Sequence, residues 1–555
     1  MVTSDEQLAS EAGVEILKKG GNAVDAAVAV AFALAVVEPQ AGNIGGGGFM
    51  LVRLADGRAA FIDYLEEAPK RASRDMYVRP DGTLDEEGST IGYRSVAVPS
   101  TVAGLELALK TYGTRKLADV MAPAIRLAVQ GFPVSERLAA SIRDSQQRLR
   151  RFSVSKRIFL KDGALYQPGE TFRQPELAVT LRRIARFGSV EFYRGRTARE
   201  LADEVARAGG LITLEDLAAY KPKIREPLRA TYNVNGSRWE MITSPPPSSG
   251  GVAAIEALNI LAPIELKDWS DAQSVHWVVE AMRRVFADRA AYLADTDFAH
   301  VPVKGLIDPR YADELRATID PQRASSSRQI GAGNPAPFDS AQGSREETDQ
   351  LEARRMAATN IREGNHTSHF SVVDAAGNAV ANTYTLNDSY GSAVTTTTGF
   401  LLNDHMDDFT VQPGHPNMFG LVQSEANTIG PGKRPLSSMI PTILLRDGKL
   451  SFITGSPGGP RIISATLLSI LNWMRLGMDA QAAINAPRFH QQWLPDVLYV
   501  ETTFPQATAR ELEQRGYKIS ERDWIGNIEA IAIDPKTGER LGAADPRRKG
   551  VAVGY

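Results

Sequence analysis

The stretch EGNHTSHFS, residues 363–371, decides the fold because it joins a long polar tract to a strand pattern, SVVDAAGNAV, that starts at Ser371. A Thr hydroxyl at this junction is a poor nucleophile unless a base lies beside it, and an N-terminal amine is such a base. A break between His366 and Thr367 would put amine and hydroxyl on one residue. A strand-initiating Thr without catalytic function is the commoner alternative, and the residues alone leave both open.

The tract before this junction differs from the rest of the chain. Residues 321–365 contain SSSRQ, GNPAP and DSAQGSREETDQ, which offer little to bury, so we expect mostly mobile loop. Beyond it the pattern is β-rich, with hairpin turns at 374–378 and 446–448. The chain is therefore predicted to have two parts, joined by an exposed segment that ends at His366.

Composition excludes several classes of function. The 555 residues carry 63 basic and 66 acidic side chains, which gives no footprint for nucleic acid or an anionic membrane. No cysteine is present, and the seven His residues form no HExxH motif, so we expect neither a metal site nor a cofactor. Residues 455–459, GSPGG, do not have the spacing of a GxSxG elbow.

The N-terminal region predicts a buried helix and, after a run of glycines, a strand. Asn22 offers a cap, residues 23–37 are rich in Ala and Val, and Pro39 stops the helix. The apolar run 26–37 is too short to span a bilayer and no cleavage-site pattern follows it, so we expect no signal peptide in this sequence. Four glycines, 45–48, precede a strand without a Gly-Lys-Ser/Thr motif, which favours close backbone packing over a phosphate cradle.

Residues 100–320 are mostly helical in pattern, and we interpret them as scaffold. Within them SPPPSSGG, residues 244–251, is too rigid and small-residued for a helix. It fits a linker and a pocket wall equally well.

Many long motifs of this chain occur together in one known family. They are residues 21–34 with the glycine run to 50, 210–217 with Tyr220, 245–251, 367–371, 383–387, 406–409, 433–439, 454–459, 486–490 and 554–555. On these the sequence resembles the γ-glutamyltranspeptidase (glutathione hydrolase) family over essentially its whole length. The resemblance implies an N-terminal-nucleophile hydrolase with a four-layer αββα sandwich of the α/β class.

The resemblance also implies an inactive precursor that cleaves itself before Thr367. The products would be a large chain, residues 1–366, with 321–366 as the mobile segment before the cut, and a small chain, residues 367–555. The Thr367 hydroxyl would first attack the carbonyl of His366 and later a substrate amide. The acyl group would then pass to water or to an amino-acid or peptide amine.

The resemblance carries site roles onto matching positions. Thr385 would orient the nucleophile, although a plain strand Thr is the alternative. Backbone N–H groups of Gly458 and Gly459 would form the oxyanion hole, and the apolar periodicity of residues 462–471 places them at the start of a helix. The remaining positions are Asn387 and Asp408 for the substrate ammonium, and Ser437 and Ser438 for its α-carboxylate, with a capping or turn role as the alternative for the two serines.

Three departures from the family pattern concern the substrate. Leu65 stands in DYLEEAP where the family has the Arg that clamps the glutamyl carboxylate, and Leu cannot make that bidentate pair. His405 stands where Gln or Glu helps to bind the amino group, and Phe419 stands where a lid Tyr is often found. We therefore expect the catalytic residues to be complete and the binding of the glutamyl group to be altered.

The sequence thus predicts an autoprocessing amide hydrolase or acyltransferase with γ-glutamyl compounds such as glutathione as the leading substrates. One alternative is an acylase of the same family for another acyl group, glutaryl-cephalosporin-like or oxamate-like, which Leu65 favours. A second is an unprocessed, noncatalytic binding protein. Resemblance to bacterial members implies a periplasmic or secreted location.

Overall fold

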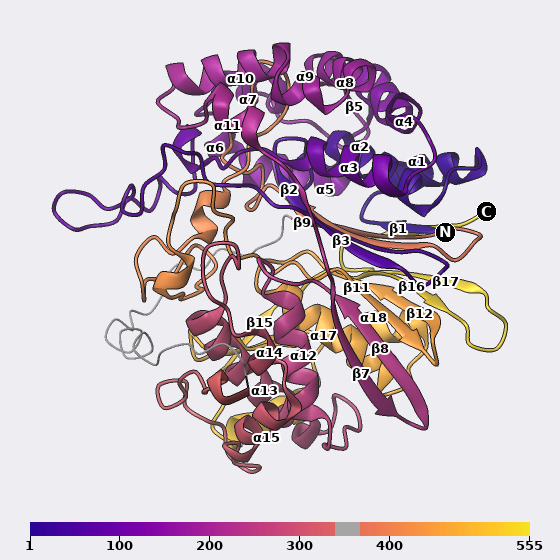
Figure 1. Cartoon of the computed structure of the whole chain (residues 1–555), viewed down its shortest axis with the longest axis vertical. Coiled ribbons are helices and arrows are strands. Elements are labelled where there is room, and N and C mark those ends of the chain that lie inside the picture. The colour runs from indigo at the N-terminus through magenta and orange to yellow at the C-terminus, as the bar shows by residue number, and fades with distance from the viewer. Residues whose placement is uncertain (339–366) are drawn as a thin grey trace.

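Two antiparallel sheets stacked face to face, each covered on its outer side by helices, make four layers (Figure 1). The computed structural model describes residues 1–338 and 367–555. The layers are those of the predicted αββα sandwich, so the expected fold class is confirmed.

The first sheet has seven strands and contains the predicted nucleophile near its centre. Strand β9 lies between β1 and β10, and every neighbouring pair is antiparallel. In spatial order the strands are β18 (Val551–Val553), β1 (Val2–Ser4), β9 (Thr367–Val373), β10 (Ala379–Thr385), β2 (Gly47–Arg53), β3 (Ala59–Tyr64) and β6 (Lys223–Arg225).

The second sheet has six antiparallel strands. In spatial order they are β17 (Arg540–Ala544), β16 (Glu529–Ile533), β12 (Lys449–Thr454), β11 (Thr442–Arg446), β8 (Ser237–Thr243) and β7 (Leu228–Val234). The β7–β8 hairpin interrupts the region expected to be mostly helical. Every second residue of β7 is exposed, which is the pattern of a strand with one face toward solvent, and β7 lies at the edge of the sheet.

Helices of the N-terminal half cover the first sheet (Figure 1). The buried helix predicted at 23–37 is α2, where Asn22 and Asp25 form a reciprocal capping box and every residue is buried. The layer comprises α1 (Gln7–Lys18), α2 (Ala23–Val37), α3 (Thr101–Tyr112), α4 (Leu117–Gln130), α5 (Glu136–Asp144), α6 (Gln146–Leu149), α7 (Ser153–Phe159), α8 (Pro175–Phe187), α9 (Ser189–Tyr193), α10 (Arg196–Arg207) and α11 (Leu214–Ala219).

A second helical layer covers the six-stranded sheet (Figure 1). It comprises α12 (Gly250–Leu261), α13 (Ala272–Tyr292), α14 (Val303–Leu306), α15 (Pro309–Ala317), α17 (Arg461–Met474), α18 (Ala480–Asn485) and α19 (Gln506–Gln514). Two small sheets complete the described strands: β4 (Phe132–Pro133) with β5 (Thr171–Phe172), and β13 (Phe489–His490), β14 (Leu498–Glu501) and β15 (Ile519–Arg522).

The first sheet is buried on both faces. Phe49 and Leu51 of β2 pack in the core shared with the second sheet, whereas Met50 and Val52 pack in the core under α1 and α2. Successive side chains of a strand point to opposite faces, so β2 is apolar from Phe49 to Val52. The sheet therefore holds the residues on β9 and β10 in a rigid setting.

The glycine run fits against the strand that carries Thr385. A Cβ on Gly46 would overlap the carbonyl oxygen of Thr385, and a Cβ on Gly48 would overlap that of Thr383. The prediction of close backbone packing is confirmed, since only a hydrogen leaves room here.

The described beginning of the predicted mobile segment is held by contacts. The Ser327 carbonyl accepts a hydrogen bond from the Trp493 indole at 3.0 Å, and the Gly333 N–H donates to Asp288 at 2.7 Å. Residues 339–366, where the rest of that prediction falls, lie outside the described residues.

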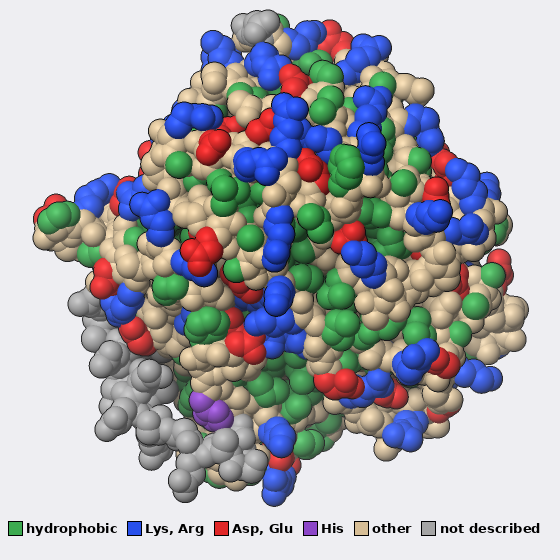
Figure 2. All heavy atoms as spheres, turned by 45° about the horizontal axis from the view of Figure 1, so that its top comes forward, with side chains coloured by type: hydrophobic (Ala, Val, Ile, Leu, Met, Phe, Trp, Pro, Cys, Tyr) green, Lys and Arg blue, Asp and Glu red, His purple; other side chains and the backbone are tan. Residues whose placement is uncertain are grey.

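The surface carries both charges. Basic, acidic and apolar side chains are interspersed over the face shown in Figure 2, as the near balance of charges in the sequence predicts. Among the described helices, none combines the length and apolar character needed to cross a membrane.

Replacing Gly46 by Ala is expected to destabilise the protein by about 1–3 kcal/mol, because the added methyl forces the backbone of β10 to move. The midpoint of thermal unfolding measures the effect. Gly331→Ala is the control, since no atom lies within 4 Å of a Cβ at that position. Equal midpoints for the two variants would contradict this packing argument.

Candidate active site

Thr367 lies directly opposite Thr385 in the first sheet. The two residues are paired in the β9–β10 register, and the Thr367 hydroxyl donates to the Thr385 hydroxyl at 3.3 Å. The N–H of Asn387 donates to the Thr385 oxygen at 2.9 Å, which fixes that side chain in turn. The strand pairing therefore brings the predicted nucleophile and its predicted orienting residue together.

A small pocket surrounds the Thr367 hydroxyl. Its open space is about 20 Å³, close to the room that one water molecule needs. The lining residues are Arg289, Thr367, Thr385, Asn387, His405, Asp408, Phe419, Leu421, Leu436, Ser437, Ser438, Met439, Gly459, Pro460 and Ile462. Most of the predicted site residues are among them.

Two predicted site residues are not in this lining, and a third cannot be placed. Gly458 directly precedes the lining residue Gly459, and Leu65 is fully buried in the core between the sheets. The Leu65 carbonyl accepts a hydrogen bond from the Tyr220 hydroxyl at 3.0 Å. His366, the predicted residue before the cut, lies outside the described residues.

Gly458 and Gly459 lead into helix α17. Their φ angles of 134° and 57° lie in the left-handed region, which favours glycine at both positions. Their carbonyls accept the Arg461 and Ile462 N–H groups of the first turn. Within the described part of the chain neither glycine N–H donates a hydrogen bond. The N-terminal end of the helix therefore offers donors of positive potential beside the pocket.

His405 is a buried cation in the pocket wall. Its Nδ1 lies 2.8 Å from Glu66 Oε1, with angles short of a well-aligned hydrogen bond, and its Nε2 lies 3.8 Å from Asp408 Oδ2. Burial by itself lowers the pKa of His405, but the carboxylates of Glu66 and Asp408 reverse this and raise it to about 9. The imidazole is therefore charged at neutral pH.

Asp408 faces the same pocket with its side chain 13% exposed. Burial raises the pKa of Asp408 to about 7, although the charge of His405 opposes that rise. Burial also raises the pKa of Glu66, against the same opposing charge. The site thus contains two carboxyl groups with raised pKa values beside a resident cation.

Arg289 enters the pocket from α13, a helix that the sequence predicted to be scaffold. The residue is 2% exposed, and its guanidinium donates to the hydroxyls of Ser249 at 3.0 Å and Ser438 at 3.3 Å. Sequence reasoning missed it because α13 also carries the buried Arg283 and Arg284, and nothing in the pattern separates the three.

The stretch 244–251 forms part of the wall behind the pocket, but the expectation that it contains no helix is wrong for Gly250 and Gly251, which begin α12. The Ser249 hydroxyl donates to the Ser437 carbonyl at 2.7 Å, and the Ser437 N–H donates to the Pro247 carbonyl at 2.9 Å. Of the two interpretations left open, the wall is therefore the one that the structure supports.

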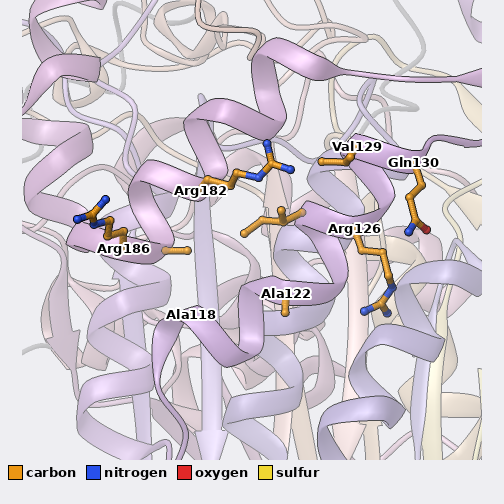
Figure 3. Close-up of a pocket in the computed structure, with 9 residues that line it drawn as sticks. Ala118, Ala122, Arg126, Val129, Gln130, Arg182 and Arg186 are labelled. Atoms are coloured by element: carbon orange, nitrogen blue, oxygen red, sulfur yellow. The ribbon is translucent and has the colours of Figure 1, made fainter.

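A larger hollow lies between α4 and α8 (Figure 3). It has an open volume of about 610 Å³ and is lined by Ala118, Ala122, Ile125, Arg126, Val129, Gln130, Arg182, Ala185 and Arg186. This lining contains no hydroxyl, imidazole or carboxylate, so it lacks the groups for acyl transfer. Among the described residues, no cluster of three or more potential ligands could hold a metal ion.

Replacing His405 by Gln is expected to make the folding stability fall less steeply as the pH rises above neutral. The folded pKa of His405, about 9, lies above the ordinary 6.5. Its stabilising charge is therefore fully present below about pH 6.5 and is lost as the pH rises through about 9, a change on the order of 3 kcal/mol. Urea unfolding at a series of pH values across this window measures the difference.

His490→Gln is the matched control for this experiment. Burial lowers the pKa of His490 to about 3, so that ring is neutral throughout the window. A His405→Gln protein with the same alkaline slope as the His490→Gln protein would show that the buried cation is absent.

Comparisons with known proteins agree with this geometry. Residues 9–555 match the family described as gamma-glutamyltranspeptidase. The chain is 44% identical to the glutathione hydrolase proenzyme of Pseudomonas sp. (strain A14), covering 100% of this chain and 94% of the relative. It is also 44% identical to the proenzyme of that name from Escherichia coli (strain K12), covering 99% and 90%.

A solved structure shows the same architecture. The crystal structure of cephalosporin acylase from Bacillus halodurans superimposes with a TM-score of 0.86 at 29% identity, covering 100% of this chain and 95% of that one. The resemblance inferred from the sequence motifs is thereby confirmed, and the chain belongs to the gamma-glutamyltranspeptidase family.

Proposed function

We propose that this protein is an autoprocessing γ-glutamyl hydrolase and transpeptidase that acts through Thr367. The observation that carries the proposal is the Thr367 hydroxyl, placed at the first residue of β9, paired with Thr385 and open to the pocket. The names of the glutathione hydrolase relatives support glutathione and related γ-glutamyl amides as substrates.

The first step of the proposal is self-cleavage. The Thr367 oxygen attacks the carbonyl carbon of residue 366, the C–N bond breaks, and an ester with a free α-amine forms. Water then hydrolyses the ester, which leaves chains 1–366 and 367–555. The two chains remain in one fold because β9 is paired with β1 of the first chain and β10 with β2.

The second step uses the freed amine as the base for its own hydroxyl. The Thr367 oxygen attacks the amide carbonyl of the substrate, and the N–H groups of Gly458 and Gly459 stabilise the resulting oxyanion. Thr385 holds the nucleophile in place. Loss of the amine product leaves an acyl-enzyme, which water or an amino-acid or peptide amine resolves. No cofactor is part of this scheme.

The pocket supplies groups for the substrate's charged end. Asp408 and Asn387 face an ammonium, and Ser437 and Ser438 offer hydroxyls to a carboxylate. The Asn387 side chain is oriented by donating to the Asp404 carbonyl at 3.2 Å. Leu65 is proposed as the position where this chain differs from the family's carboxylate clamp.

Another acyl group is the second candidate. Leu65 in place of the clamp favours it, and the likeness to a cephalosporin acylase fits it. We propose a periplasmic or secreted location, which the resemblance to bacterial members of the family supports. An unprocessed binding protein with this fold would show no self-cleavage.

Purified protein is expected to give two bands of about 40 and about 20 kDa on a denaturing gel, at roughly 110 Da per residue. Thr367→Ala is expected to stay a single chain and to lose turnover of a γ-glutamyl anilide, because no hydroxyl is left to form the ester. Thr367→Ser is the control and should still be cleaved. A single wild-type chain that turns over the anilide would refute the mechanism.

Replacing Thr385 by Val is expected to slow self-cleavage and turnover by about 3- to 10-fold, since the lost hydrogen bond is worth about 0.5–1.5 kcal/mol. Single-turnover rates measure the change. Thr385→Ser keeps the hydroxyl and should retain the wild-type rate. If Val and Ser at this position behaved alike, the hydroxyl contact at 3.3 Å would have no orienting role.

A further inference from the structure

Arg289 is a buried cation without a carboxylate partner in the described part of the chain. All three of its side-chain contacts are neutral: the hydroxyls of Ser249 and Ser438 and, at 3.5 Å, the amide oxygen of Gln423. Buried arginines are normally paired, because an uncompensated charge is costly to desolvate. An anionic ligand in the pocket would supply the missing partner.

The Arg289 guanidinium lies in the pocket where it can contact an acyl group bound at Thr367. Arg289 lines the same pocket as Thr367. Its Nη2 donates to the hydroxyl of Ser438, one of the two serines proposed to bind a carboxylate. The Ser249 and Gln423 contacts hold the planar group in one orientation, which is the state required for a bidentate carboxylate pair.

Other candidate cations are less well placed. Position 65 offers only an apolar side chain in the core between the sheets. The His405 ring lies 2.8 Å from a carboxylate oxygen of Glu66 and faces Asp408, so its charge already has partners. Burial lowers the pKa of Arg289 to about 10, while the charge of Asp408 opposes that shift, so the guanidinium is charged at neutral pH.

We propose that Arg289 determines the acyl specificity of this enzyme by binding the free carboxylate of the acyl group, in place of an arginine at position 65. The substrates are then monoamides of dicarboxylic acids, with γ-glutamyl amides among them. This inference rests on the proposed acyl transfer at Thr367.

The substrate ammonium adds less than the carboxylate in this arrangement. Asp408, the carboxylate that would receive it, already has His405 as a resident cation 3.8 Å away. A glutaryl group, which has the carboxylate and lacks the ammonium, is therefore expected to be accepted about as well as a γ-glutamyl group.

Four anilides built on the same butanoyl chain, and differing only in the groups on its fourth carbon, separate the two charges. They are γ-glutamyl with both, glutaryl with the carboxylate only, 4-aminobutanoyl with the ammonium only, and butanoyl with neither. The wild type is expected to prefer glutaryl over butanoyl by about 10- to 100-fold in kcat/KM, the range for a charge-assisted hydrogen-bond pair. A wild type without this preference would overturn the inference.

In Arg289→Met the preference for glutaryl over butanoyl is expected to disappear through a higher KM for the two carboxylate substrates. Turnover of the butanoyl anilide should persist, since that group has no carboxylate to lose. Arg289→Lys keeps a charge without the planar fork and should retain part of the preference. If either folded variant retained the full preference, Arg289 would not be the determinant.

Arg475→Met is the matched control. Arg475, the residue after the last turn of α17, also lacks a carboxylate partner among the described residues. Its guanidinium instead donates to the backbone carbonyls of Leu261 and Ile264. It is expected to keep the preference. Self-cleavage into two bands reports folding in every variant that keeps Thr367.

A binding measurement separates failure of this inference from failure of the proposed function. Glutarate is expected to raise the thermal midpoint of the Thr367→Ala protein more than butanoate does, and Arg289→Met in that background should abolish the difference. If the wild type were neither cleaved nor active while glutarate still bound through Arg289, the acyl-transfer function would be wrong. If the enzyme were active and glutarate bound independently of Arg289, the carboxylate assignment would be wrong.

Discussion

The pairing of β9 with β10 inside a sheet buried on both faces is the constraint on which the site depends. It sets Thr367 opposite Thr385 by backbone hydrogen bonds alone, before any pocket side chain is considered. Glycines at 46 and 48 let β2 approach β10 closely enough for this arrangement. Position in a doubly covered sheet limits the motion of both hydroxyls, and precise placement is what a weak nucleophile needs.

The pocket beside Thr367 and Thr385 contains several buried charged groups, each of which would be costly to bury without the others. Glu66 and Asp408 lie at the two ring nitrogens of His405. Among the described residues, Arg289 donates only to the neutral oxygens of Ser249, Gln423 and Ser438. Burial strengthens every electrostatic interaction among these groups. A ligand therefore has to match the arrangement of charges, and specificity follows from the number and place of the charges the ligand brings.

Much of this arrangement could be predicted from the sequence. The Ala- and Val-rich helix 23–37, the hairpin turns and the close glycine packing follow from local rules. The motifs around Thr367, Asn387 and Ser437 identified the family and most of the pocket. Local patterns did not identify the β7–β8 hairpin, whose strand assignment depends on pairing with β11 two hundred residues later in the chain.

Arg289 and Glu66 could not have been assigned to the site from the sequence. Each acts through a contact between distant segments: Arg289 with Ser438, and Glu66 with His405. The charged pattern of α13 resembles an ordinary solvated helix face, although the helix is almost wholly buried. Only the folded chain distinguishes an arginine that pairs within its own helix from one that faces a pocket.

The interleaving of the two chain portions has a consequence for the processed protein. Strands from before residue 366 flank β9 and β10 in one sheet, and β7 and β8 complete the other. Neither fragment could leave without exposing unpaired backbone and the apolar faces of both sheets. The proposed cleavage would therefore yield a heterodimer whose two fragments stay joined through shared sheets without any covalent link.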